Sequence, residues 1–196
     1  MTMNLSLNNV QVILGSKSPR RKQLLEGLDI SFTTTNIDAD ESFSASMNVH
    51  DVAKFLAEKK SKAFFGDLAN SVLITSDTTV INGSNILNKP ADISEAMSMI
   101  MELSGKSHIV NTGVCLRTET KCTSFYVETE VEFADLSEAQ IRYYVQTYKP
   151  FDKAGGYGIQ EWIGMVGIRN INGCYYNVMG LPTQKLYEEL CRFIKD

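Results

Sequence analysis

The sequence predicts an α/β protein built on a mixed β-sheet with flanking helices. Short buried-strand patterns alternate with helical patterns through the first half of the 196-residue chain, as they do in folds with parallel strands. Two longer strand patterns then follow each other across a short turn, which requires antiparallel pairing. Since 43% of the residues are hydrophobic and a chain of this size buries about 70% of its surface, we expect one domain over residues 1–196.

The first half of the chain is predicted from caps and apolar runs. Val10–Leu14 is a short buried strand, and the next helix begins at Pro19 with Ser18 as its N-cap and Gly27 as its terminator. Alternation and helical periodicity then predict a strand over residues 31–37, a helix over 49–65, a strand over 72–75 that ends at 76–78, and a hairpin turn at Asn82-Gly83.

The second half is predicted in the same way. A capping box at Asp92 opens a helix that closes at Gly105, and Ser137 caps a helix that stops before Pro150. The remaining elements are strands over residues 107–117 and 123–133, a hairpin around Asn172-Gly173 and a final helix over 183–195.

Composition excludes several classes of protein. Nineteen basic against 23 acidic residues give a net charge of −4, which argues against a nucleic-acid polymer as partner. No apolar run approaches the ~20 residues of a membrane span. Met1–Val10 lacks the basic start and apolar stretch of a signal peptide, and the four cysteines form no CxxC pair. We therefore expect a cytoplasmic protein with reduced thiols and no membrane contact.

A basic loop is the first candidate binding site. Gly15 to Arg21 joins a strand to a capped helix, where free backbone N–H groups can bind an anion. The hydroxyls of Ser16 and Ser18 and the cations of Arg20 and Arg21 add donors there. Cations at a helix start oppose the helix dipole, so a solvated basic helix start is the alternative to a phosphate site.

Lys60 and Asp77 are the next candidates. Lys60 falls near the centre of the apolar arc of its helix, where an unpaired cation is costly, so it either snorkels or faces a polar site. Asp77 follows a buried strand, and we expect it at the exposed strand end, where α/β proteins bind ligands. A simple loop cap is the alternative for Asp77.

Three further segments are weaker on their own. Asp40 and Glu41 follow Asp38 in an acidic loop that either ligates a hard cation or is only solvated. Lys89 adds a cation after a turn. The glycine-rich segment 152–160 permits close approach of backbone to a ligand, but a flexible loop explains it equally well.

These motifs, in their order along the chain, resemble the Maf family of nucleotide pyrophosphatases. The resemblance runs from Val12 to about Pro182 and rests on residues 16–21, Leu56-Ala57 with Lys60, Asp77-Thr78, Leu87-Asn88-Lys89-Pro90, Leu103-Ser104-Gly105, Thr129-Glu130-Val131, residues 152–160 and 176–182. Asn88 stands where the family usually has glycine, which leaves the position of Lys89 open.

The resemblance implies metal-dependent hydrolysis of a nucleoside triphosphate to the monophosphate and pyrophosphate. It also implies two lobes around a deep cleft, similar to inosine triphosphatases, and a homodimer. Asp77 matches the family's proton acceptor. Arg20, Thr78 and Gln160 match the positions for base choice and carry the residues of the dTTP/UTP branch, which points to nucleotide-pool cleaning or a role linked to cell division.

The mechanism that we expect places a water in line with the α-phosphorus and neutralises the triphosphate. Asp77 orients or deprotonates the water. The phosphates are held by Ser16, Ser18, Arg20, Arg21, Lys60 and Lys89, and Mg²⁺ or Mn²⁺ by Asp77 with Asp40 or Glu41.

Three alternatives remain at this point. The branch that acts on 7-methyl-GTP typically has a tryptophan at the Arg20 position. A non-catalytic nucleotide-binding regulator of cell division would use the same phosphate pocket without a water-activating acid. A nucleic-acid binder would read a phosphate backbone through residues 17–22, and the scarcity of other basic clusters disfavours it.

Overall fold

The computed structural model describes residues 10–195, and these divide into two compact units. Unit 1 comprises, within this range, residues 10–77, Thr112–Val127 and 180–195; unit 2 comprises Thr78–Asn111 and Glu128–Met179. One domain over the whole chain and a cleft between lobes therefore stay predictions. The expectation about a signal peptide concerns residues that lie, except for Val10, outside the described range.

The predicted mixed sheet with flanking helices is confirmed. Among residues 10–195, seven strands take part, in the order β2-β1-β3-β5-β6-β7, with β4 paired to β3. Strand β1 pairs in parallel with β2 and with β3, whereas β3–β4 and β6–β7 are antiparallel. The strands are Gln11–Gly15 (β1), Phe32–Thr35 (β2), Ser71–Asn82 (β3), Asn85–Leu87 (β4), Ser107–Arg117 (β5), Cys122–Phe133 (β6) and Ile168–Asn172 (β7).

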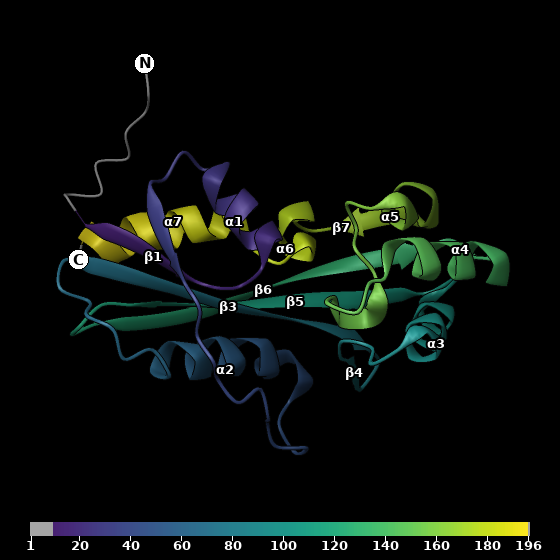
Figure 1. Ribbon diagram of the computed structural model, residues 1–196, viewed down its shortest axis with the longest axis horizontal. Helices are drawn as coiled ribbons and strands as arrows, with labels where there is room; N and C mark the ends of the chain where they lie inside the picture. The colour runs from purple at the N-terminus through teal and green to yellow at the C-terminus, as the bar shows by residue number, and fades with distance from the viewer. Residues whose placement is uncertain (1–9, 196) are drawn as a thin grey trace. The chain divides into compact units, whose positions relative to one another are not determined.

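Unit 1 surrounds the parallel strands with three helices. They are α1 (Pro19–Glu26), α2 (Val49–Lys62) and α7 (Thr183–Lys195). Helices α1 and α7 lie on one side of the strands and α2 on the other (Figure 1). The strands between them are accordingly apolar, since Leu14, Leu73 and Ile74 are fully buried. This layering brings the end of β1, the middle of β3 and one face of α2 together.

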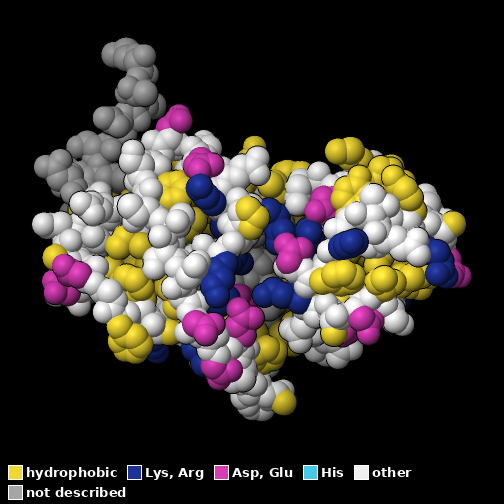
Figure 2. Space-filling view, in the orientation of Figure 1, with side chains coloured by type: hydrophobic (Ala, Val, Ile, Leu, Met, Phe, Trp, Pro, Cys, Tyr) yellow, Lys and Arg dark blue, Asp and Glu magenta, His cyan; other side chains and the backbone are white. Residues whose placement is uncertain are grey.

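Unit 2 is built on a separate apolar core. Its helices are α3 (Ile93–Leu103), α4 (Glu138–Tyr148), the 3₁₀ turn η1 (Ala154–Gly156), α5 (Trp162–Gly167) and α6 (Tyr175–Met179). Phe133, Ile141 and Tyr144 are fully buried members of this core. Hydrophobic side chains also remain exposed over α4 and α5, among them Tyr143 and Met165 (Figure 2).

Most predicted elements are confirmed, and two are wrong. The strand expected to end at residues 76–78 continues to Asn82, where the predicted Asn82-Gly83 turn leads into β4. The expected hairpin around Asn172-Gly173 is absent from the described residues, because β7 pairs with β6 and the chain then enters α6. Within residues 10–195, no helix has the length and apolar character needed to cross a membrane.

Candidate functional site

The loop between β1 and α1 forms the helix start that the sequence predicts. Ser18 caps α1 by accepting a hydrogen bond from the backbone N–H of Arg21 at 3.4 Å, and the Ser18 N–H donates to Ser16 Oγ at 3.1 Å. A Cβ at Gly15 would lie 2.5 Å from a methyl group of Ile37, so a larger residue would require the Ile37 side chain to move where β1 enters the loop. The first turn of α1 carries no acidic residue, which leaves its N-terminus suited to an anion.

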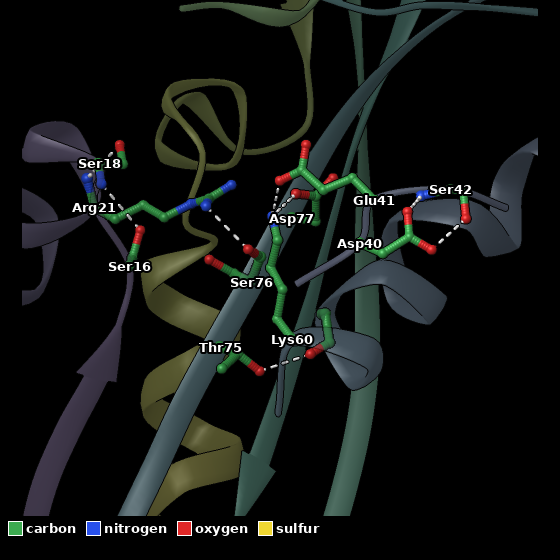
Figure 3. A network of polar contacts seen from close by, with 11 residues as sticks. Ser16, Ser18, Arg21, Asp40, Glu41, Ser42, Lys60, Thr75, Ser76 and Asp77 are labelled. Carbon is green, nitrogen blue, oxygen red and sulfur yellow. Dashed lines mark hydrogen bonds and ion pairs between the residues drawn. The ribbon is translucent and has the colours of Figure 1, made fainter. Parts of the chain in front are cut away.

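The side chain of Arg21 is held by two backbone carbonyls of unit 1. Its Nε donates to Gly180 O at 2.8 Å. Its guanidinium nitrogen Nη1 donates to Ser76 O at 2.9 Å (Figure 3). Burial lowers the pKa of Arg21, and the nearby Asp77 carboxylate acts in the opposite direction. The two carbonyls hold the guanidinium in a fixed orientation, and the planar donors of arginine match the geometry of a phosphate group. Arg20, its neighbour on α1, is half-buried.

Lys60 lies between two carboxylates. Its Nζ donates to Asp77 Oδ1 and lies 2.8 Å from Glu41 Oε1, so both acids point toward one ammonium group (Figure 3). The Lys60 side chain is 13% exposed. Thr75 Oγ1 donates to Ala57 O at 2.7 Å and thereby ties β3 to α2 beside this pair. Lys60 is therefore a paired cation and not a snorkelling one.

Asp77 is buried inside a strand, which corrects the expectation that it marks an exposed strand end. Its side chain is 12% exposed, and β3 continues for five residues beyond it. A buried strand can contain an acid when a cation compensates its charge. The cation of Lys60, supplied from α2, compensates the carboxylate and allows the strand to continue.

The structure separates Asp40 from Glu41. Asp40 Oδ2 lies 2.7 Å from Lys59 Nζ, and its other oxygen accepts a hydrogen bond from the Ser42 N–H at 2.9 Å. The hydrogen bond from Lys59 is the main cause that holds the pKa of Asp40 well below its ordinary value. Glu41 instead turns toward Lys60, next to Asp77 (Figure 3). Of the two acids, only Glu41 shares a cation with Asp77.

The donors present fit a hard divalent cation that is completed by a substrate. No group of three or more His, Cys, Asp and Glu side chains is arranged to hold a metal anywhere in the described part of the chain. Two carboxylates do converge, those of Glu41 and Asp77. Mg²⁺ is commonly bound by one or two carboxylates together with substrate phosphates and water, so this pair suffices for such a site.

The other three candidate residues belong to unit 2. Thr78 follows Asp77 on β3 and is half-buried, and Lys89 is exposed just after β4. The carbonyl of Asn88 accepts a hydrogen bond from the Gly155 N–H at 3.1 Å, which fixes the turn before Lys89. Gln160 Oε1 is shielded from solvent and accepts no hydrogen bond from the residues that the structure describes. These residues are described within their own unit only.

Sequence reasoning missed two supports of these residues. The backbone carbonyls of Ser76 and Gly180 hold Arg21. Because almost every residue has such a carbonyl, this contact cannot be predicted from the types of residue in the sequence. The buried cation Lys153 pairs with Glu161 next to Gln160. The signal for this pair was present, because a lysine inside a glycine-rich segment with an acid eight residues later is unusual for a solvated loop.

Comparison with known proteins adds independent information. A family model described as "Maf-like protein" matches residues 11–193. The chain belongs to the Maf family. The resemblance inferred from the motifs is thus confirmed over nearly the whole chain.

Several proteins with assigned names are similar to this chain over nearly its whole length. A protein of Parabacteroides distasonis named dTTP/UTP pyrophosphatase is 47% identical over 96% of this chain and 98% of its own length. A protein of Bacteroides thetaiotaomicron with the same name is 46% identical over 94% of this chain and 97% of its own length. Among solved structures, the Ham1 protein of Staphylococcus aureus matches 64% of this chain and 72% of its own with 12% identity and a TM-score of 0.43.

Proposed function

We propose that this Maf protein hydrolyses pyrimidine nucleoside triphosphates, UTP and dTTP above all, to the monophosphate and pyrophosphate. The observation that carries the proposal is Asp77, an acid buried in a strand and held by Lys60 beside Glu41 and near the guanidinium of Arg21. A carboxylate with cations around it suits a reaction in which water attacks a polyanion. The names of the relatives support the class of substrate.

In this proposal Asp77 acts on the attacking water. Lys60 fixes the direction of the Asp77 carboxylate, which can then accept a proton from a water placed in line with the α-phosphorus. The bond between the α-phosphorus and the bridging oxygen breaks, and the negative charge that develops leaves with pyrophosphate. Arg21 neutralises phosphate charge, and the N–H groups at the start of α1 donate to phosphate oxygens together with Ser16 and Ser18.

The divalent metal belongs to the same proposal. Glu41 and Asp77 would hold Mg²⁺ or Mn²⁺, and Asp40 drops out of the set because Lys59 and Ser42 already engage it. Such an ion, when bound, neutralises phosphate oxygens and makes a coordinated water more acidic. Lys60 then exchanges part of its contact with the two acids for contact with the triphosphate.

Base choice is assigned to Arg20, Thr78 and Gln160, and Lys89 is assigned to the phosphates. Gln160 suits a pyrimidine because its amide offers one acceptor and two donors to the polar edge of the ring. Its Oε1, shielded from solvent, would gain a donor from the ring. Arg20 at the start of α1 favours this assignment over the 7-methyl-GTP branch, which has tryptophan at that position.

We also propose a cytoplasmic homodimer that binds neither a nucleic-acid polymer nor a membrane. The net charge of −4 supports the exclusion of the polymer. Light scattering at several protein concentrations measures the oligomeric state, and a monomer at all of them contradicts the dimer.

The matched pair Glu41→Gln and Asp40→Asn tests the site directly. We expect Glu41→Gln to lower kcat/KM for UTP by about 100-fold, since it removes one of the two carboxylates that would hold the divalent metal. Asp40→Asn removes the charge of an exposed acid that Lys59 and Ser42 engage, and should stay within about fivefold of the wild type. Equal effects of the two substitutions, measured as pyrophosphate release with Mg²⁺, would contradict the proposed site.

A further inference from the structure

The segment Gly158–Glu161 in unit 2 is held by a buried polar network. Tyr144, fully buried on α4, accepts a hydrogen bond from the Gly158 N–H at 2.9 Å and donates to Glu161 Oε2. Burial raises the pKa of Tyr144, and the hydrogen bond to Glu161 acts in the same direction, so the hydroxyl stays protonated and remains a donor. One hydroxyl therefore joins both ends of the four-residue segment.

Lys153 completes the network from the other side. Its Nζ lies 3.1 Å from Glu161 Oε1 and 2.7 Å from Asp152 Oδ1, and its side chain is 9% exposed. The Glu161 side chain is 18% exposed, whereas that of Asp152 is 58% exposed. Glu161 is thus the buried counter-ion of Lys153, and both of its carboxylate oxygens are engaged.

The fit around this ion pair is tight. A Cβ at Gly158 would lie 2.9 Å from the Glu161 carboxylate and 3.0 Å from the Lys153 side chain. The segment also closes on itself, because the Glu161 N–H donates to Gly158 O at 3.0 Å. Gln160 lies inside this closed turn, so the turn sets the direction in which the Gln160 side chain leaves the backbone.

We propose that Glu161 is a positioning residue for base recognition: held by Lys153 and Tyr144, it fixes the turn that carries Gln160. The inference rests on the proposed function, because it assigns Gln160 to the base of the nucleotide. An amide distinguishes a pyrimidine edge from a purine edge only when its donor and acceptor are held in one orientation. The network supplies that rigidity without touching the substrate itself.

The variants Glu161→Gln and Tyr144→Phe test this role. Glu161→Gln keeps the shape and removes the charge that pairs with Lys153, and Tyr144→Phe removes the hydroxyl that joins Gly158 to Glu161. We expect each to raise KM for UTP roughly 5- to 30-fold, as for the loss of one or two well-placed hydrogen bonds, with a smaller change in kcat. The ratio of kcat/KM for UTP over GTP should fall by a similar factor.

Glu138→Gln is the matched control, since Glu138 is an exposed acid on α4 that pairs with Arg142 one helical turn along the same helix. It should leave both the KM and the UTP-to-GTP ratio unchanged. A Glu161→Gln enzyme with the wild-type KM and ratio overturns the proposal. The proposal is also overturned if Glu161→Gln loses activity toward UTP and GTP equally and has a lowered melting temperature. That result would mean that Glu161 has a purely structural role.

A second readout separates this inference from the proposed function. Hydrogen exchange at the Gly158 amide should be faster in Tyr144→Phe and Glu161→Gln than in the wild type or Glu138→Gln. If the wild-type protein hydrolyses neither UTP nor dTTP, the proposed function is overturned, and base recognition by Gln160 falls with it. If UTP is hydrolysed and exchange at Gly158 is unchanged in both variants, the positioning role alone is overturned.

Discussion

Replacing Lys60 with methionine removes a cation from between two carboxylates. Lys60 Nζ contacts Asp77 Oδ1 and lies 2.8 Å from Glu41 Oε1. The Lys60 and Asp77 side chains are 13% and 12% exposed, whereas Glu41 is 49% exposed. Methionine keeps the stem of the side chain on α2, so the main change is that two acids face each other without their shared counter-ion.

The magnitude follows from this partial burial. Breaking a fully buried ion pair from one side costs ~3–5 kcal/mol, and an exposed pair contributes only ~0–1 kcal/mol. Since Asp77 is mostly buried and Glu41 is half-exposed, we expect Lys60→Met to lower the free energy of unfolding by about 2–3 kcal/mol. Hydrolysis of UTP should be lost as well.

Urea unfolding followed by circular dichroism measures this effect. The wild type, Lys60→Met, Asp77→Asn and the double variant form a mutant cycle, and we expect a coupling energy of about 1–3 kcal/mol between the two positions. Strictly additive effects would refute the reasoning, because they mean that Lys60 and Asp77 do not stabilise each other. A Lys60→Met protein as stable and as active as the wild type would also contradict this pairing. That result is expected of a lysine whose methylene groups pack but whose ammonium group has no role.

Three further predictions concern stability. Burial lowers the pKa of His108 from 6.5 to about 4. Between these pH values the unfolded chain binds a proton at His108 that the folded chain does not bind. The free energy of unfolding should therefore fall as the pH drops from 6.5 toward 4, by up to about 1.4 kcal/mol per pH unit. The double variant His108→Phe/Tyr157→Phe removes both partners of the buried hydrogen bond and should flatten this slope in urea titrations between pH 4.5 and 7.5. Gly113→Ala should lower the free energy of unfolding by about 1–3 kcal/mol, because its Cβ would lie 2.3 Å from the backbone of α2. Gly27 has φ −66°, and a Cβ added there would have no contact under 3.5 Å, so Gly27→Ala should be neutral or stabilise the protein by up to about 1 kcal/mol. Equal losses of stability in Gly113→Ala and Gly27→Ala would contradict the packing around Gly113. Ser137→Ala, which opens the capping box of α4, should cost about 1 kcal/mol, and an unchanged urea midpoint would mean that the cap contributes nothing.

The parts of the fold that could be predicted depend on local chemistry. Ser18, Asp92 and Ser137 cap their helices as expected, because a cap is a contact between residues three apart in the sequence. The end of β3 could not be predicted, because its continuation through Asp77 depends on a lysine 17 residues away that only the folded chain brings close. The hairpin expected at Asn172-Gly173 failed for a related reason, since the partner of β7 is β6.

The candidate site shows the same division. The sequence places Lys60 on the apolar face of its helix and Asp77 next to a buried strand, and both positions are unusual for a charged residue. Only the structure shows that the two side chains form an ion pair. Asp40 and Glu41 are neighbours of like charge in one loop, so no pattern could separate them. The structure separates them, because Lys59 pairs with Asp40 and the next residue of α2, Lys60, pairs with Glu41. A lysine in the glycine-rich segment is a signal that the sequence offers for Lys153, but its pairing with Glu161 is seen only in the folded chain.

The most direct test of the central claim is the product of UTP hydrolysis, measured by phosphorus NMR with Mg²⁺ for the wild type and for Asp77→Asn. We expect UMP and pyrophosphate from the wild type. For Asp77→Asn we expect a drop in kcat of roughly 10²–10⁴-fold, the contribution of a positioned general base. Orthophosphate and UDP as products would contradict the choice of bond. Pyrophosphate release at the wild-type rate by a folded Asp77→Asn protein would contradict the role of Asp77.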